Sequence, residues 1–568
     1  MKFQNYPVEE FCDLKQMLRQ VAEKHPNKTV FMQKVEGVYR SCRYDKYQAD
    51  VNGLGEELLR MGLEGSRILL VGANCYRWAV AFMSIICGVG TVVPVDRELS
   101  PAELRGAARY AEASAVICDD SLAHVFASME DTLRVIPFSR LNLLVKRGRE
   151  RVKEGARQYL DHPIDPNAMH AILFSSGTWG EMRGVMLSHR NLCFAISEMR
   201  RMVSIEEQDV FLSVLPLHHI YECVCGFLCP MSCGGSVAFA ESVEKLGKNL
   251  REVSPTVMLC VPAVLEGMYR RVWGQIVSQG AETRVKRLVE VTNALPNPKL
   301  SLSAKQKSFA PLHKVFGGRL RLIITGGAEA SVEALDGMRD LGIPTLQGYG
   351  MTECASVIAL NRDTRYKSDA AGLPTPNSLL DIADMQEDGL GEIRYRGDSV
   401  MLGYYRMPRR TAKVLRNGWF YTGDLGYFDE DGFLRVVGRA QNAIVLSDGR
   451  KILPEAQERL LCKSPYIKEA AVIPCRREGA DAPELVAVLC PDPQQIEESV
   501  SQENFTNEQA EAQTALLMRR ALAEVNGELP PHQRIREFVI RREGLPKTAI
   551  GKIKRRELIE AYADHLIR

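Results

Sequence analysis

Hydroxyl, glycine and arginine residues suited to holding phosphate gather in ILFSSGTWGEMRGVMLSHRNL, residues 172–192. The apolar lead-in to this stretch is typical of a buried strand. The residues after it are Ser175, Ser176, Gly177, Thr178, Gly180 and Arg183. Glycines let backbone N–H groups converge on one point, and a guanidinium adds a planar fork of donors. The stretch therefore predicts a phosphate-binding loop, with a flexible Ser/Gly turn as the alternative.

The loop is not a Walker motif, which needs G-x-x-x-x-G-K-[ST]. Gly184 is followed by Val185, and Lys552, which follows a glycine, is followed by Ile553. Any phosphate chemistry of this chain must therefore be of another kind.

A second stretch with chemical potential is LQGYGMTECAS, residues 346–356. Gly348 and Gly350 flank Tyr349 and leave its ring face uncovered for stacking on a flat base. Thr352 and Glu353 supply the oxygen ligands that Mg²⁺ prefers. A glycine-rich turn before a helix is the alternative.

Two further segments end in polar turns. Residues 320–325, LRLIIT, predict a buried strand, and ligands of open parallel sheets sit beyond the carboxyl ends of strands. The turn there contains Gly327, Ala328 and Glu329. In YTGDLG, residues 421–426, we expect Asp424 in a tight turn, where its carboxylate can accept hydroxyl protons such as those of a ribose.

Histidine and cysteine clusters raise the question of a metal. His218 and His219 follow a predicted strand, and adjacent strand residues point to opposite faces, which argues against one shared ion. Four cysteines follow at near-helical, apolar spacing, at positions 223, 225, 229 and 233. Zinc pairs usually lie in glycine-rich knuckles, so free thiols in a buried helix are favoured.

Composition limits the class of protein. The chain has 568 residues, enough for two or more domains, with a net charge of +2 that gives no case for nucleic acid. Fifteen scattered cysteines and a polar N-terminus without a signal peptide favour a reducing, cytoplasmic setting. The apolar run at residues 78–95 is broken by glycine and proline, which favours a buried helix and a core strand over a membrane span.

Residues 146–157 are rich in lysine and arginine. A solvated helix face is the simpler interpretation, and peripheral contact with a membrane surface is the alternative.

Five motifs in one order resemble the signatures of the adenylate-forming superfamily, which contains acyl-CoA synthetases, luciferases and adenylation domains. The first stretch is similar to YTSGTTGxPKGV, the second to YGxTE, and YTGDLG to TGDxG. GRAQNAIVLSDGRKILPE at 438–455 resembles the superfamily hinge motif, and LPKTAIGKIKRREL at 545–558 resembles its closing motif. The resemblance covers about residues 10–560. Departures from the usual residues fall at Trp179, Met182, Arg183, Gln441 and Asn442.

The resemblance implies an α/β fold with a large N-terminal domain of stacked α/β sheets, a β-rich subdomain, and a small mobile α+β C-terminal domain. We expect an AMP-binding domain at 1–440, with its β-rich part at about 371–440, and a lid domain at 441–568.

The same resemblance implies the site residues. Lys552, Arg439 and His219 would be catalytic, and Thr178 with Glu353 would hold Mg²⁺. The residues that would bind ATP or coenzyme A are Ser175, Ser176, Gly177, Thr178, Gly180, Arg183, Gly327, Ala328, Glu329, Gly348, Tyr349, Gly350, Thr352, Asp424, Arg439 and Gly449.

The implied reaction activates a carboxylate, which resists thiol attack until it is joined to AMP. A lysine ammonium at the meeting point of carboxylate and α-phosphate would stabilise charge and orient two anions. Rotation of the lid domain would then admit a thiol. The resemblance favours a fatty acid, ATP and coenzyme A, with membrane contact and oligomeric state left open. Loading of a carrier protein, and a degenerate nucleotide-binding regulator motivated by Trp179, Met182 and Asn442, are the alternatives.

Overall fold

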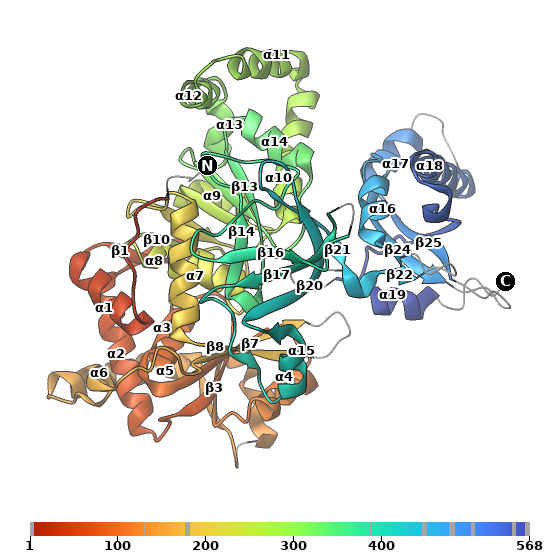
Figure 1. The fold of residues 1–568 in the computed structure, drawn as a ribbon. Helices are drawn as coiled ribbons and strands as arrows, with labels where there is room; N and C mark the ends of the chain where they lie inside the picture. The colour runs from red at the N-terminus through yellow and green to blue at the C-terminus, as the bar shows by residue number, and fades with distance from the viewer. Residues whose placement is uncertain are drawn as a thin grey trace. The chain divides into compact units, whose positions relative to one another are not determined.

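The computed structural model describes residues 5–129, 131–176, 182–386, 389–445, 451–475, 483–500, 506–547 and 553–562. The chain forms two compact units (Figure 1). Unit 1 comprises residues 1–175, 182–380 and 395–420, and unit 2 comprises 176–181, 381–394 and 421–568.

The larger sheet of unit 1 has nine strands in the order β15-β14-β13-β12-β11-β9-β10-β1-β2. These strands are β1 Thr29–Val35, β2 Val38–Arg43, β9 Val210–Ser213, β10 Ser236–Phe239, β11 Val257–Cys260, β12 Leu322–Thr325, β13 Thr345–Met351, β14 Ser356–Leu360 and β15 Leu373–Pro374. The central pairs run parallel, whereas β2 at one edge and β14 and β15 at the other pair antiparallel. The nine-stranded sheet is therefore parallel in its centre and antiparallel at both edges.

The second sheet has seven strands in the order β18-β8-β7-β4-β3-β5-β6. These strands are β3 Ser66–Val71, β4 Gly90–Val95, β5 Ala115–Cys118, β6 Arg134–Pro137, β7 Ala171–Ser176, β8 Met182–Leu187 and β18 Gly403–Tyr404. The apolar run at residues 78–95 forms most of helix α3 Tyr76–Ser84, a π-helical turn and strand β4, all buried, as predicted. None of the described helices is long and apolar enough to cross a membrane.

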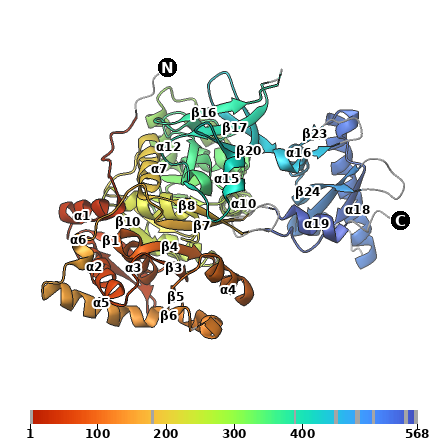
Figure 2. The ribbon, with the colours of Figure 1, turned by 60° about the horizontal axis from the view of Figure 1, so that its bottom comes forward.

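Helices pack around and between these sheets. They are α1 Leu14–Lys24, α2 Tyr44–Arg60, α4 Pro101–Tyr110, α5 Phe138–Lys153, α6 Gln158–Asp161, α7 His189–Met202, α8 Cys229–Met231, α9 Leu246–Val253, α10 Pro262–Ser278, α11 Glu282–Asn293, α12 Pro298–Ser308, α13 Ala310–Val315, α14 Val332–Asp340 and α15 Pro408–Val414. Helix α3 contacts both β1 and β3, so it lies between the two sheets (Figure 2). The sheets are thus stacked with helices between them, as expected.

The basic run at residues 146–157 begins in helix α5, and part of it has a structural role. Arg149 Nη1 lies 2.8 Å from Asp50 Oδ1, and Arg151 Nε lies 3.2 Å from Glu57 Oε2. Both carboxylates belong to α2 and are buried. A buried carboxylate needs a paired cation, so these arginines fasten α5 to α2 instead of presenting all their charge to a partner.

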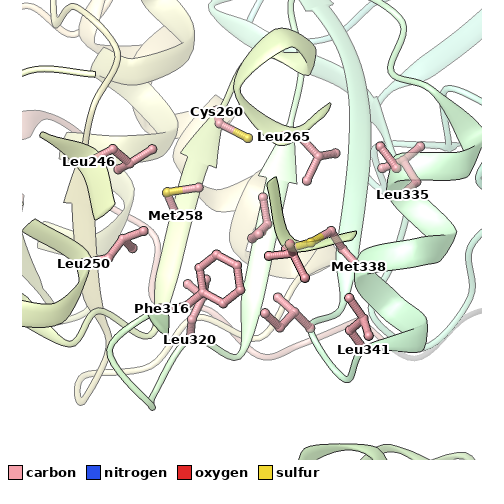
Figure 3. Close-up of a cluster of buried hydrophobic side chains, with 14 of the residues drawn as sticks. Leu246, Leu250, Met258, Cys260, Leu265, Phe316, Leu320, Leu335, Met338 and Leu341 are labelled. Carbon is pink, nitrogen blue, oxygen red and sulfur yellow. The ribbon is translucent and has the colours of Figure 1, made fainter. Parts of the chain in front are cut away.

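A large apolar cluster covers one face of the nine-stranded sheet in unit 1. Figure 3 shows Met258 and Cys260 of β11 beside Leu265 of α10 and Met338 of α14. Cluster members on β11 and β12 have side chains no more than 1% exposed. This core fixes the carboxyl ends of β11 and β12, where the site segments begin.

A further sheet has the order β16-β17-β20-β19, with β21 paired to β20. Its strands are β16 Leu379–Ala383, β17 Gly391–Arg396, β19 Leu415–Arg416, β20 Trp419–Phe428 and β21 Leu434–Arg439. These short strands lie in the segment that the sequence marked as β-rich.

The C-terminal part of unit 2 is an α+β structure. Its strands are β22 Ile444–Val445, β23 Lys451–Ile452, β24 Ile467–Cys475, β25 Glu484–Pro491 and β26 Glu537–Ile540, and its helices are α16 Pro454–Leu461, α17 Pro493–Val500, α18 Asn507–Glu528 and α19 Arg555–Tyr562. Helix α17 ends at Val500, and α18 begins at Asn507. A capping box between Thr506 and Gln509 begins α18.

Candidate active site

Glu353 is the centre of a polar cluster in unit 1. It lies in the short 3-10 turn Thr352–Cys354 after β13. Tyr404 OH donates a hydrogen bond to Glu353 Oε1 at 2.8 Å, and Ser175 Oγ donates to the same oxygen at 3.4 Å. Burial, followed by the carboxylate of Glu353, raises the pKa of Tyr404, so its hydroxyl remains a donor. The structure therefore brings two sequence candidates, Ser175 and Glu353, into one site.

Arg183 joins this cluster from strand β8. The guanidinium is close enough to Tyr404 to oppose the rise of the tyrosine pKa. Its Nε and Nη2 are buried and find no hydrogen-bond partner among the described residues. Buried N–H donors are nearly always paired, so two unpaired donors on a cation indicate a place for an anion. The arrangement fits phosphate oxygens, and the carboxylate and hydroxyl oxygens beside it form a donor set suited to Mg²⁺.

Strand β13 carries the tyrosine expected to stack on a base. Gly348, Tyr349 and Gly350 are all half-buried, in a strand and not in a glycine-rich turn before a helix. A Cβ at Gly350 would lie 1.8 Å from the Ser356 carbonyl oxygen, and one at Gly348 would lie 2.8 Å from Leu360 Cδ1. The backbone of β14 therefore leaves no room for a side chain at Gly350, whereas at Gly348 only the end of the Leu360 side chain would have to shift. The register of the two strands shifts beside Tyr349. Thr352, which begins the next turn, is half-buried beside them.

The turn after β12 lies next to the same strand. A Cβ at Gly326 would contact the Tyr221 ring at 3.4 Å and the Gly348 carbonyl oxygen at 3.5 Å. Gly327 has a φ of +88°, which an L residue rarely adopts. Gly327, Ala328 and Glu329 are exposed. These predicted binding residues therefore form an accessible rim beside β13.

His218 and His219 lie in a turn after β9, not on a strand, so the argument from strand alternation was wrong. Their ring centroids are 4.2 Å apart. Asn74 fixes the turn, because its Nδ2 donates to Leu215 O at 2.7 Å and its Oδ1 accepts from Leu217 N at 3.0 Å. Burial lowers the pKa of His218 to about 4, which keeps that ring neutral.

The four clustered cysteines are free thiols, three of them buried and Cys233 half-buried. Cys223 and Cys225 lie in the π-helical segment Glu222–Leu228. No group of three or more metal-ligating side chains occurs in the part of the chain that the structure describes.

Comparison with known families identifies the family of this chain. Residues 18–405 match the family model of AMP-binding enzymes, and residues 441–567 match the AMP-binding enzyme C-terminal domain. The chain belongs to the AMP-binding enzyme family. It is an adenylate-forming enzyme of the AMP-forming acid–thiol ligase superfamily, which confirms the resemblance drawn from the motifs.

Curated relatives of this AMP-binding enzyme include a "Long-chain-fatty-acid--CoA ligase FadD15" of Mycobacterium bovis, 26% identical over 87% of this chain and 84% of the relative. A "Long-chain-fatty-acid--CoA ligase" of Escherichia coli O157:H7 is 26% identical over 88% of this chain and 86% of the relative. "Long-chain-fatty-acid--CoA ligase 1" of Cavia porcellus is 27% identical over 78% and 68%, respectively.

Solved structures of similar fold include an anthranilate CoA ligase in complex with anthranoyl-AMP, with a TM-score of 0.75, 18% identity and 99% of both chains covered. An o-succinylbenzoate CoA synthetase from Bacillus subtilis, in complex with ATP and magnesium ion, has a TM-score of 0.72 and 22% identity, with 95% of this chain and 98% of that chain covered. The α/β fold with a large N-terminal and a small C-terminal domain is thereby confirmed.

In unit 2 of this AMP-binding enzyme, Asp424 and Arg439 lie side by side. The expected tight turn at Asp424 was wrong, because the residue lies inside strand β20 and pairs across to Arg439 of β21. Gly423 has a φ of +75°, which gave the turn-like signal without ending the strand. Arg439 Nε lies 3.1 Å from the buried Asp424 Oδ1. A held carboxylate beside a guanidinium fits the hydroxyls of a ribose.

Described residues on both sides of Lys552 form ion pairs within unit 2. Before it, Lys547 Nζ lies 2.7 Å from Glu469 Oε1. After it, the Arg555 guanidinium forms two hydrogen bonds to the Glu458 carboxylate, at 2.5 and 2.6 Å. Lys547 and Ile553 form an antiparallel β-bridge.

Several predicted residues lie outside the described residues, namely Gly177, Thr178, Trp179, Gly180, Gly449 and Lys552, and so does the side chain of Ser176. Asn442, which departs from the usual aspartate, donates from Nδ2 to Glu455 Oε1 at 2.6 Å. An aspartate at this position would face that carboxylate with like charge, so the departure suits its surroundings.

Sequence reasoning missed two residues of this region. Tyr404 lies in β18, far from any motif, and only the pairing of β18 with β8 brings it to Glu353. Glu222 belongs to none of the motifs, yet it is fully buried, and burial raises its pKa to about 8. A glutamate within an apolar run was the available signal, since unpaired carboxylates are seldom buried.

Proposed function

We propose that this enzyme joins a medium- or long-chain fatty acid to coenzyme A through an acyl-AMP intermediate. The observation that carries the proposal is the cluster of Ser175, Arg183, Glu353 and Tyr404 at the end of the phosphate-loop strands. It offers a carboxylate and a buried guanidinium, two of whose nitrogens have no hydrogen-bond partner among the described residues. The names of the curated relatives support a fatty acid as substrate.

In the first step, a carboxylate oxygen of the fatty acid attacks the α-phosphorus of ATP, and pyrophosphate leaves. Arg183 would stabilise the negative charge of the departing phosphates, and Glu353 would hold Mg²⁺, which would offset the remaining charge. Tyr404 and Ser175 orient the Glu353 carboxylate through their hydrogen bonds. Lys552 stabilises the meeting of the two anions.

In the second step, the sulfur of coenzyme A loses its proton and attacks the acyl carbon, and AMP leaves. The phosphate ester of AMP is a far better leaving group than the oxide of a free carboxylate, which is why ATP is needed. Tyr349 and the Asp424–Arg439 pair are proposed to hold the adenosine through both steps, and the turn that holds His219 is proposed to line the thiol path.

The test is product analysis with carboxylates of graded chain length. We expect pyrophosphate and AMP in equal amounts with an acyl-CoA product, and the highest kcat/KM for medium or long chains. Formation of ADP, or product on an acyl carrier protein but never on coenzyme A, would contradict the proposal. A hydroxylamine trap in the absence of coenzyme A reports the acyl-AMP step separately.

A further inference from the structure

We propose that the helical hairpin α11–α12 of unit 1 docks on the surface of an anionic phospholipid membrane. The hairpin lies at the outer edge of the helices of unit 1, beyond α10 and α14 (Figure 1). Helix α11 packs against α10 and α12 rather than on a sheet, which leaves much of its surface uncovered.

The first observation is a concentration of positive charge. Residues 262–315, which form α10 to α13, contain nine lysines and arginines but only three glutamates, whereas the whole chain has a net charge of +2. The single buried cation is Lys305, which pairs with Asp340 at 3.0 Å. The remaining lysines and arginines of the segment are exposed.

The charge of the hairpin is largely unopposed. No salt bridge among the described residues involves Arg284, Arg287 or Lys299. Helix α5 is equally basic, but its Arg149 and Arg151 are held by buried carboxylates. Lys146, Arg147 and Lys153 of α5 are exposed as well, so charge alone does not separate the two basic surfaces, and the apolar tip of the hairpin distinguishes them.

The second observation is an exposed apolar tip. Residues 293–300, which connect α11 to α12 and begin α12, are all exposed. Leu295 and Leu300 in this stretch are 38% and 59% exposed, and Val291 on the last turn of α11 is 60% exposed. Arg284, Arg287 and Val291 follow helical spacing and share one stripe of α11. Apolar tips flanked by cations are suited to the boundary between headgroups and acyl chains.

An anionic membrane is the partner that fits both the positive charge and the exposed apolar tip of the hairpin. Phosphates of anionic lipids complement the cations that have no salt bridge to a described residue, and each such cation adds to the binding free energy near an anionic surface. The small apolar tip reaches only the interfacial layer. The inference goes beyond the proposed function but agrees with it, because a membrane is where long-chain fatty acids partition.

The experiment is co-sedimentation of the full chain with vesicles of phosphatidylcholine alone and of equal parts phosphatidylcholine and phosphatidylglycerol. We expect binding to the anionic vesicles only, weakened by salt. The charge variant Arg284→Gln/Arg287→Gln/Lys299→Gln should bind roughly 100-fold more weakly, and the tip variant Val291→Ser/Leu295→Ser/Leu300→Ser at least about tenfold more weakly.

The matched control is Lys146→Gln/Arg147→Gln/Lys153→Gln, which removes the same charge from α5. It should keep wild-type binding, and circular dichroism checks the fold of every variant. Equal loss in the control, no loss in the hairpin variants, or no binding by wild type would overturn the proposal. A change of oligomeric state in the tip variant without vesicles would instead identify a second copy as the occupant. Vesicle binding is measured without substrate, so its failure is distinct from a failure of ligase activity.

Discussion

The buried carboxyl of Glu222 makes the stability of unit 1 depend on pH. The side chain is fully buried, and burial raises its pKa from 4.5 to about 8, with the Ser213 hydroxyl opposing the rise. Neither carboxyl oxygen has a hydrogen-bond donor of good geometry among the described residues. The nearby thiols of Cys223, Cys225 and Cys260 have pKa values raised by burial, so they bring no charge at neutral pH.

The direction follows from the two pKa values. The unfolded chain releases the proton near pH 4.5, whereas the folded chain keeps it until about pH 8. Raising the pH between these values therefore favours the unfolded state, and the free energy of unfolding falls. The full cost is about 5 kcal/mol once both states are ionised, of which about 3 kcal/mol develops between pH 6 and pH 9.

The substitution Glu222→Gln removes the titration while keeping the shape. We expect the stability of the variant relative to wild type to increase by about 3 kcal/mol from pH 6 to pH 9. Equilibrium urea unfolding, followed by the fluorescence of buried Trp78, measures the difference. A glutamine amide adds buried polar atoms of its own, which can alter the stability at every pH. The decisive quantity is therefore how the difference in the free energy of unfolding between variant and wild type changes with pH.

Glu23→Gln is the matched control, because Glu23 is an exposed carboxyl on α1 of the same unit. Its stability relative to wild type should change by less than about 0.5 kcal/mol over the same range. A constant difference for Glu222→Gln, or a decrease with rising pH, would show that Glu222 is ionised in the folded protein and would refute the reasoning.

Four further outcomes are expected. Lys552→Ala should lower the rate of acyl-AMP formation steeply while thioester formation from supplied acyl-AMP survives, and equal loss of both steps would make the lysine structural. Arg183→Ala should raise the KM for ATP by roughly 10- to 100-fold, because it removes charged hydrogen bonds that contribute about 1.5–3 kcal/mol. Arg183→Lys should restore part of the affinity for ATP, and unchanged ATP kinetics in Arg183→Ala would exclude a phosphate contact. Tyr404→Phe removes a hydrogen bond to Glu353 and should raise the Mg²⁺ concentration needed for half-maximal rate, with an unchanged Mg²⁺ curve arguing against a metal at Glu353. Arg555→Met breaks a buried pair with Glu458 and should destabilise the C-terminal part of unit 2 by about 3–5 kcal/mol, seen as faster hydrogen exchange in β24 and α16; unaltered exchange would mean that the pair is dispensable.

Local patterns were sufficient for the strands before Ser175 and at residues 320–325 and for the helix and strand of residues 78–95. Helix α3 and strand β4 were predicted because glycine and proline interrupt the apolar run at residues 78–95, which disfavours a membrane span. The sequence analysis placed Asp424 in a turn because glycine is common in turns; Gly423 has the positive φ of a turn residue but lies inside a strand. Only pairing with Arg439 on β21, a contact decided by the neighbouring strand, keeps the residue in an extended ladder.

Site residues that belong to a motif within one segment could be predicted from the sequence, whereas a residue brought to the site only by strand pairing could not. Ser175, Arg183 and Glu353 were named from their own stretches, and their proximity is now seen in the structure, although their roles stay predictions. Tyr404 could not be found in this way, because its neighbours carry no chemical pattern and its position depends on β18 pairing with β8. The pKa of Glu222 depends on packing by several elements, which no local pattern encodes.

Four arginines of this chain differ in their partners: three stabilise the fold, and one is suited to binding a ligand. Arg149, Arg151 and Arg555 each face a buried carboxylate that satisfies them without any ligand. Arg183 is also buried, but two of its nitrogens have no partner among the described residues. Leaving such donors unpaired costs about 1–3 kcal/mol each, and a phosphate that accepts from them removes this cost on binding. Ligand binding to the folded state alone raises stability by RT ln(1 + [L]/Kd). Stabilisation by ATP should therefore depend on Arg183, whereas the three paired arginines should contribute equally with or without nucleotide.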